Sequence, residues 1–174
     1  MPCVGLCYAE RSRFLLLVKP FRVVEHVTDI DLEELQQEGV QGFIFDLDNT
    51  IMAPHTGILD DVIAAWLKKI ESMGFQSVVV SNNPLGFYTQ EAEKTLSIPV
   101  LGNAGKPRRG ALYKALRLLK LEPSQVVVVG DRPLTDIWAG QRLGAKTILV
   151  DPLTKHQEHA VVKVLRRLER LFVY

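Results

Sequence analysis

The chain has 174 residues, of which 47% are hydrophobic and 24% charged, a composition that excludes a disordered or fibrous protein. Its formal net charge of +1 gives no support for nucleic-acid binding through bulk positive charge. The longest apolar run falls far short of the roughly 20 residues that cross a bilayer. We therefore expect a single domain over residues 1–174 in a cytoplasmic protein that does not span a membrane.

Charge is distributed unevenly along this chain. Residues 1–24 and 155–174 carry a net charge of +3 each, so the overall +1 leaves −5 for residues 25–154. Over residues 159–174 one apolar and one basic stripe recur at helical spacing, a pattern that fits a helix on an anionic membrane surface and equally a helix packed on the core. We expect a core at about 40–151 with basic N- and C-terminal extensions. These extensions either bind lipid, which would place the protein peripherally on the inner face of the membrane, or pack on the core.

Short apolar runs, most of them rich in β-branched residues, predict five strands, at 42–45, 77–80, 98–101, 126–129 and 147–150. Continuous rather than alternating apolar runs are typical of strands buried on both faces of a parallel sheet. Helical periodicity predicts helices over 59–73 and 109–119, and a capping box from Thr28 to Asp31 ahead of a short helix that ends at Gly39. The alternation predicts an α/β fold: a three-layer Rossmann-like domain with a central, mostly parallel five-stranded sheet.

Polar side chains follow these strands at the carboxyl edge of the sheet, where ligands bind in such folds. They are Asp46 and Asp48 after the first strand, Ser81 and Asn82 after the second, Lys106 in a loop before a helix, and Asp131 and Asp136 after the strand at 126–129. Each has an ordinary structural explanation, such as a helix cap, a turn former or a solvated charge. Their joint occurrence at one sheet edge favours a functional site.

The residue types at this edge suit phosphoryl transfer. Carboxylates of Asp46, Asp131 and Asp136 are hard oxygen ligands for Mg²⁺, and Ser81, Lys106 and the turn amides at Asn82 suit a phosphate dianion. A carboxylate there can attack phosphorus and form an aspartyl-phosphate. The neighbouring Asp48 can protonate the leaving oxygen and then deprotonate the attacking water.

The segments Asp46-Leu47-Asp48-Asn49-Thr50, Ser81, Lys106 and Gly130-Asp131…Asp136 resemble, in order, the four motifs of the haloacid dehalogenase (HAD) superfamily of phosphatases. The resemblance covers about residues 40–151. It implies Asp46 as nucleophile, Asp48 as general acid/base with its backbone carbonyl on the metal, and Thr50 as a supporting residue. It also implies Ser81 and Lys106 on the phosphate, and Asp131 and Asp136 on Mg²⁺ directly or through water.

A closer resemblance points to a subclass of this superfamily. Three motifs are similar to those of the subclass IIIA, YqeG-type family: Ser-Asn-Asn, Gly-Lys-Pro and Gly-Asp-Arg-Pro-Leu-Thr-Asp. That family is similar to the phosphatidylglycerophosphate phosphatases. It implies a phospholipid phosphate monoester as substrate and phosphatidylglycerol as product.

Residues 51–80 and 82–105 leave room for about one helix and one strand or loop each, so we expect no cap domain. An uncovered site favours a bulky substrate such as a phospholipid headgroup. The alternative is a soluble HAD phosphatase that acts on a sugar phosphate, nucleotide or nucleic-acid end, although the acidic centre and the lack of a basic, aromatic-rich groove count against nucleic acid. A non-enzymatic scaffold is disfavoured because every chemical position is filled.

Overall fold

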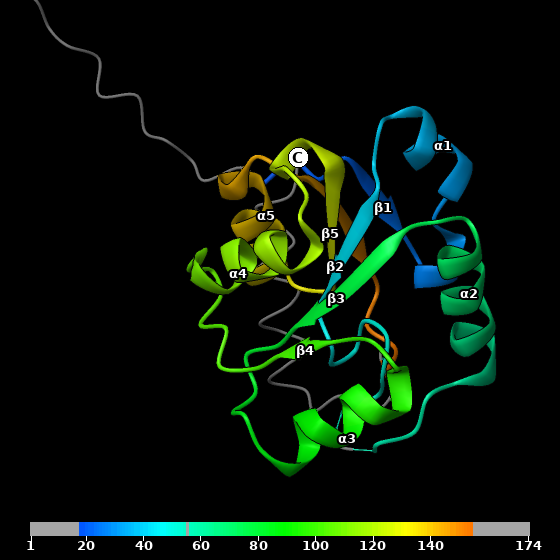
Figure 1. The fold of residues 1–174 in the computed structure, drawn as a ribbon, viewed down its shortest axis with the longest axis vertical. Coiled ribbons are helices and arrows are strands. Elements are labelled where there is room, and N and C mark those ends of the chain that lie inside the picture. Colours follow the sequence, from blue (N-terminus) through cyan, green and yellow to red (C-terminus); the bar gives the residue numbers. More distant parts are fainter. Residues whose placement is uncertain (1–17, 55, 155–174) are drawn as a thin grey trace, which may run out of the picture.

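The computed structural model describes residues 18–54 and 56–154, in which strands and helices alternate along the chain (Figure 1). The strands are β1 (Arg22–Val24), β2 (Gly42–Phe45), β3 (Gln76–Val80), β4 (Val100–Leu101), β5 (Val126–Gly130) and β6 (Lys146–Val150). The α-helices are α1 (Leu32–Gln37), α2 (Asp61–Ser72), α3 (Phe87–Leu96), α4 (Gly110–Leu119) and α5 (Trp138–Leu143). Short 3₁₀ turns lie at Val27–Asp29 and Pro123–Gln125, and a π-helical turn at Pro133–Ile137.

The described strands form one parallel sheet in the order β1-β6-β5-β2-β3-β4. The expectation of five strands was therefore wrong by one, because β1 adds to the edge of the sheet beside β6. Its residues Arg22 and Val23 are exposed, so β1 lacks the buried apolar run by which the other strands could be recognised. Edge strands are held mainly by backbone hydrogen bonds, which leave little trace in the sequence.

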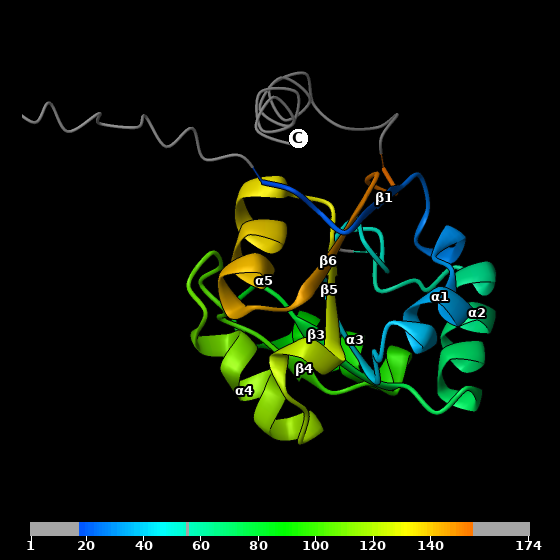
Figure 2. The same cartoon turned by 90° about the horizontal axis from the view of Figure 1, so that it is seen from above.

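Helices cover both faces of the sheet, which makes three layers, and Figure 2 shows α1 and α2 on one side and α4 and α5 on the other. Alternation along β2 decides which side chain faces which layer. Phe43 and Phe45 stack at 5.1 Å between ring centroids and meet Trp66 of α2 edge-on. Ile44, between them, packs with the residues of α4 and α5. The sheet is thus buried on both faces, as the continuous apolar runs predicted.

The helix starts show how local polar groups set the element boundaries. Asp60 caps α2 by accepting a hydrogen bond from the Val62 N–H at 2.8 Å. For α1 the capping residue is Asp31, which accepts from the Glu34 N–H. The capping box predicted from Thr28 to Asp31 is therefore wrong: Thr28 lies within the preceding 3₁₀ turn, which His26 and Asp29 cap.

The described residues between Thr50 and Ser81 form α2 and β3, and those between Ser81 and Lys106 form α3 and β4, which leaves no inserted domain in that part of the chain. The expected amphipathic helix at 159–174 and most of the N-terminal extension lie outside the described residues. Among the described helices, none combines the length and apolar character required to cross a bilayer.

Candidate active site

The central strands bring distant acidic residues to one level. Phe45 of β2 pairs with Val79 of β3 and with Val129 of β5, so the residues that follow these strands emerge together at the carboxyl edge. Asp46 continues the ladder, because its N–H donates to the Val129 carbonyl at 2.8 Å. The chain leaves β2 for β3 on one side while β5 lies on the other, and such a switch point is where ligands bind in open α/β sheets.

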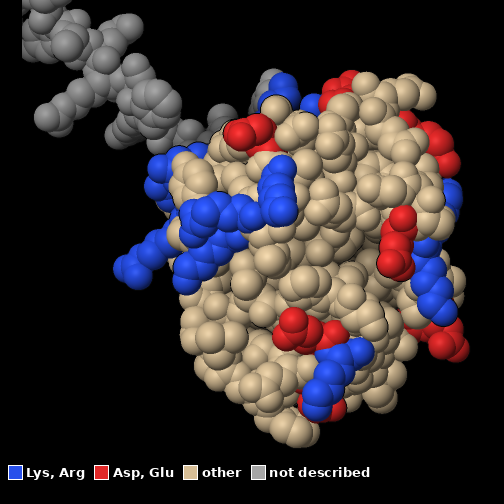
Figure 3. All heavy atoms as spheres, viewed as in Figure 1, with Lys and Arg blue, Asp and Glu red and all other residues tan. Residues whose placement is uncertain are grey.

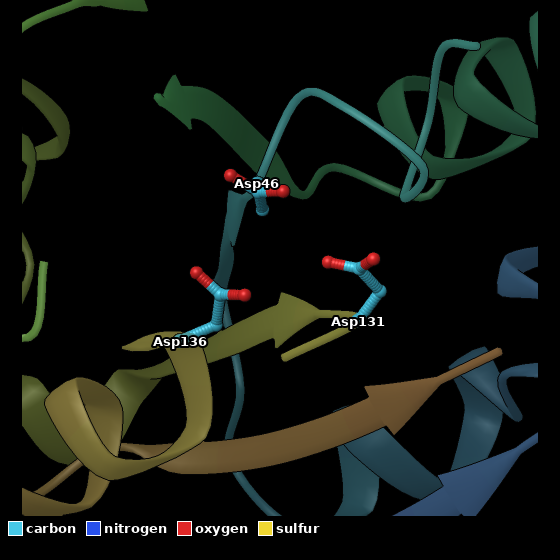
Figure 4. A group of neighbouring side chains, drawn as sticks. All are labelled: Asp46, Asp131 and Asp136. Atoms are coloured by element: carbon cyan, nitrogen blue, oxygen red, sulfur yellow. The ribbon is translucent and has the colours of Figure 1, made fainter. Parts of the chain in front are cut away.

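Three carboxylates converge at this point. Asp46 follows β2, Asp131 follows β5, and Asp136 belongs to the π-helical turn after β5 (Figure 4). One carboxylate oxygen from each lies within 4.8 Å of the others. The site needs a glycine at the end of β5, since a Cβ atom at Gly130 would lie 2.4 Å from the Cβ atom of Asp136. The absent side chain lets Asp136 lie across the strand end.

Lys106 supplies the cation that balances these acids. Its Nζ lies 2.5 Å from Asp46 Oδ1 and 2.7 Å from Asp136 Oδ1, and its side chain is only 3% exposed. Burial alone would lower the pKa of Lys106, but the carboxylates of Asp136 and Asp46 outweigh burial and raise the pKa above its ordinary value. Lys106 is therefore a permanent positive charge in the site.

The pKa of Asp46 is set by a different balance of effects. Burial raises the pKa of Asp46 to about 6 and outweighs the opposing effect of the Lys106 ammonium, while the carboxylates of Asp136 and Asp48 raise the pKa further. The carboxyl group is thus mainly ionised at neutral pH, as a nucleophile must be.

The loop after β3 forms another part of the wall of this site. Ser81 is buried, and its Oγ accepts a hydrogen bond from the Asn83 N–H at 3.1 Å. The Asn82 side chain bonds to the backbone of Lys106: its Oδ1 accepts from the Lys106 N–H at 2.8 Å and its Nδ2 donates to the Lys106 carbonyl at 3.4 Å. The side chain of Asn82 therefore fastens the Lys106 loop to the β3 loop, so a contact with phosphate would fall to its backbone amide.

The carboxylate of Asp48 has hydrogen-bond partners different from those of the other acidic residues in the site. Its Oδ2 accepts from Asn83 Nδ2 at 2.5 Å, and its Oδ1 accepts from the hydroxyl of Tyr88 at 2.5 Å. The chain turns directly after Leu47, whose carbonyl accepts from the Met52 N–H at 3.1 Å. Asp48 lines the same cavity as Asp46, but its carboxylate is held by α3 and the loop after β3. The sequence places Asn83 at this edge, within Ser81-Asn82-Asn83, but does not predict its contact with Asp48. Tyr88 was missed, because only the fold brings its hydroxyl to Asp48.

Asn49 and Thr50 continue the turn after β2. Asn49 adopts the left-handed conformation with φ at +63°, which asparagine tolerates better than most residues, and its Oδ1 accepts from Thr154 Oγ1 at 2.5 Å. Thr50 is fully buried, and its Oγ1 has no hydrogen-bond partner among the described residues. Thr50 does not line the cavity of the site.

The remaining predicted site residues line one cavity of about 210 Å³. Its walls consist of Asp46, Asp48, Asn49, Ser81, Asn82, Asn83, Lys106, Asp131, Arg132, Thr135 and Asp136. Arg132 was missed by sequence reasoning, although it directly follows Asp131; its N–H donates to Asp136 Oδ2 at 3.1 Å. The cavity is polar and has room for a phosphate group and a hydrated ion.

The donor set fits a hard divalent cation. Three carboxylates within 4.8 Å of one another repel unless a cation lies between them, and Lys106 contacts two of them. Oxygen donors in this small number are those that Mg²⁺ prefers, because it keeps several waters and leaves positions for a phosphate oxygen. The chemistry of the site is thus that of phosphoryl transfer.

Comparisons with known proteins agree with this fold. A family profile described as HAD-hydrolase-like matches residues 103–166. The fold is similar to that of the cobalt-bound deoxy-D-mannose-octulosonate 8-phosphate phosphatase from Haemophilus influenzae, with a TM-score of 0.53 and 12% identity over 65% of this chain and 69% of that one. Fold and site together define a phosphatase of the HAD type.

Sequence relatives narrow this class. A Bacillus subtilis protein named "Probable phosphatase YqeG" is 32% identical over 151 residues, which cover 87% of either chain. An Arabidopsis thaliana protein named "Phosphatidylglycerophosphate phosphatase 1, chloroplastic/mitochondrial" is 30% identical over 160 residues, 87% of this chain. The chain belongs to the YqeG-type family of HAD phosphatases. It spans 46% of the length of the Arabidopsis relative.

Proposed function

We propose that this protein is a Mg²⁺-dependent phosphomonoesterase that works through an aspartyl-phosphate on Asp46. The observation that carries the proposal is the convergence of Asp46, Asp131 and Asp136 on one point, with Lys106 buried against two of them. Asp46, Asp131, Asp136 and the backbone carbonyl of Asp48 would hold the ion. When bound, Mg²⁺ would offset negative charge on the transferring phosphoryl group.

The protein's own residues divide the reaction into two displacements. In the first, a carboxylate oxygen of Asp46 bonds to phosphorus, the bond from phosphorus to the alcohol oxygen breaks, and Asp48 gives that oxygen a proton. In the second, Asp48 takes a proton from water, the water oxygen bonds to phosphorus, and the bond to Asp46 breaks to release inorganic phosphate. Ser81 and Lys106 would hold the phosphoryl oxygens throughout.

For the substrate, we propose phosphatidylglycerophosphate, which this protein would convert to phosphatidylglycerol at the surface of an anionic membrane. Support comes from the name of the Arabidopsis relative and from a cavity that no inserted domain covers in the described part of the chain. A cavity of about 210 Å³ takes a phosphate group but not the two acyl chains of its lipid. The phosphate must therefore reach the site while the rest of the lipid stays outside.

The test is phosphate release from phosphatidylglycerophosphate, glycerol 3-phosphate, a sugar phosphate and a nucleotide, each with MgCl₂ and with EDTA. We expect release from the lipid only with Mg²⁺, and a loss of at least about 10³-fold in Asp46→Asn, because the amide is a poor nucleophile. Asp61→Asn, an exposed change at the start of α2, is the matched control. Equal or faster turnover of the soluble esters would favour the alternative of a soluble phosphatase.

A further inference from the structure

Two stretches of chain that leave the active site carry no charged side chain. Residues 49–59, after Asp48, and residues 81–90, between β3 and the start of α3, contain no Asp, Glu, Lys or Arg. Asn49 lines the cavity, and so do Ser81, Asn82 and Asn83, so both stretches begin at its walls. Both stretches thus lead away from a cavity built from charged groups without carrying charge themselves.

Large apolar side chains project into solvent from these same stretches. Phe87 is 81% exposed and Leu85 66%, and the two lie close together in the chain. Ile58, at 71%, lines a second cavity with acidic residues that include Asp60, so it is not part of this group. Phe87 is the first residue of α3 and directly precedes Tyr88, whose hydroxyl contacts Asp48. Figure 3, drawn from the same side as Figure 1, shows Lys and Arg gathered over α4 and α5, and an uncharged surface where the chain passes from β3 to α3. Single exposed apolar residues are common, but a group of them beside a site marks an interaction surface.

We propose that Leu85 and Phe87 dock the protein on a lipid bilayer and bring the mouth of the cavity to phosphate groups at the membrane surface. This inference rests on the proposed lipid substrate and names the surface by which it is reached. A lipid phosphate is fixed at the headgroup level, so the rim of the cavity must enter that level. Aromatic and aliphatic side chains are favoured there, whereas charged ones resist transfer out of water.

The size of the apolar group favours a bilayer over a second copy of the chain. Phe87 and Leu85 can bury about 300–400 Å² between them. A specific protein interface needs roughly 800 Å² on each partner. A bilayer sets no such lower limit, because each apolar side chain that enters it contributes on its own.

The first test compares one lipid in two physical forms. The double variant Leu85→Ser/Phe87→Ser is assayed on phosphatidylglycerophosphate in phosphatidylcholine vesicles, and on a dihexanoyl form kept below the concentration at which it aggregates. We expect kcat/KM on vesicles to fall by about tenfold or more, because two apolar anchors are lost. The value for the monomeric lipid should stay within about twofold, since neither side chain lines the cavity. A control with two exposed apolar residues elsewhere, Val23→Ser/Leu118→Ser, should behave as wild type.

A second test reads docking without catalysis. Phe87→Trp should show a blue-shifted fluorescence emission on addition of vesicles, relative to wild type, whose own Trp66 and Trp138 set the background. Val23→Trp, on the opposite edge strand β1, should not. This variant keeps an apolar ring at position 87, so the reading holds even if the double serine variant does not fold.

These experiments distinguish a wrong docking surface from a wrong substrate. An unchanged rate of the double variant on vesicles, or an equal loss on both lipid forms, would overturn the docking surface while the lipid substrate stood. If the wild-type enzyme hydrolysed neither lipid form, the proposed substrate would be wrong. The fluorescence of Phe87→Trp would then test the docking surface, and the absence of a blue shift would contradict it. If the wild type formed a dimer that the double variant abolished while activity on vesicles stayed intact, Leu85 and Phe87 would form an interface with a second copy of the chain and not with a bilayer.

Discussion

The Tyr88 hydroxyl donates to Asp48 Oδ1 at 2.5 Å, and Asn83 Nδ2 donates to the other oxygen of the same carboxylate at the same distance. The two donors come from α3 and from the loop after β3, so both oxygens of the Asp48 carboxylate are held by hydrogen bonds. A carboxylate that hands a proton to a leaving oxygen must be placed to within a fraction of an ångström. In the proposed reaction Tyr88 is therefore a positioning residue for Asp48.

Tyr88→Phe should slow the enzyme according to its leaving group. The kcat/KM of an alkyl phosphate should fall by about tenfold, because its alkoxide needs the proton that Asp48 supplies. The kcat/KM of p-nitrophenyl phosphate should change by less than about twofold, because p-nitrophenolate leaves without a proton and kcat/KM ends at its release, before Asp48 acts as the base toward water. Tyr113→Phe, an exposed change on α4, is the matched control. Equal losses on both substrates would show that Tyr88 has a structural role only.

Mg²⁺ should stabilise the folded protein through Asp131. At a free concentration about 100 times its dissociation constant, one bound ion raises the free energy of unfolding by about 2.7 kcal/mol. Asp131→Asn should lose most of this gain, since it removes one of the three converging carboxylates. Thermal unfolding in MgCl₂ and in EDTA measures the difference, with Asp61→Asn as control. A gain as large in Asp131→Asn as in wild type would place the ion elsewhere.

Lys106→Met should destabilise the metal-free protein by about 3–5 kcal/mol, because it leaves the carboxylates of Asp136, which is buried, and of Asp46, whose side chain is 14% exposed, without their cation. Lys94→Met removes an exposed partner of Glu91 and should cost less than about 1 kcal/mol. Urea unfolding in EDTA measures both. Similar midpoints for the two variants would mean that the buried pairs contribute no more than a surface pair.

Gly130→Ala should destabilise the protein by about 1–3 kcal/mol, because a Cβ atom there would meet the Cβ atom of Asp136 at 2.4 Å. Displacement of Asp136 should also weaken Mg²⁺ binding. Gly110→Ala is the matched control, since a Cβ atom at the start of α4 would have no neighbour within 4 Å. Chemical unfolding and Mg²⁺ titration check the two effects, and wild-type values for both would show that the strand end adapts.

Much of the fold can be predicted from local sequence. Strands buried on both faces need continuous apolar runs, and β2, β3, β5 and β6 carry them. The edge strand β1 could not be found in this way, because two of its three side chains are exposed and backbone pairing with β6 holds it. Asp46, Ser81 and Asp131 were found because each directly follows a strand, and parallel strands end at one edge.

The sequence by itself determined the α/β class, the sheet edge that carries the chemistry and the residue types gathered there, because these depend on short-range patterns. Only the tertiary structure decided which groups touch. Lys106 reaches Asp46 across 60 positions and Tyr88 reaches Asp48 across 40. Such contacts depend on how β2, β3 and β5 lie side by side and on the path of each loop, so no local pattern encodes them. They set the charge balance at Asp46 and the orientation of Asp48, on which the proposed reaction depends.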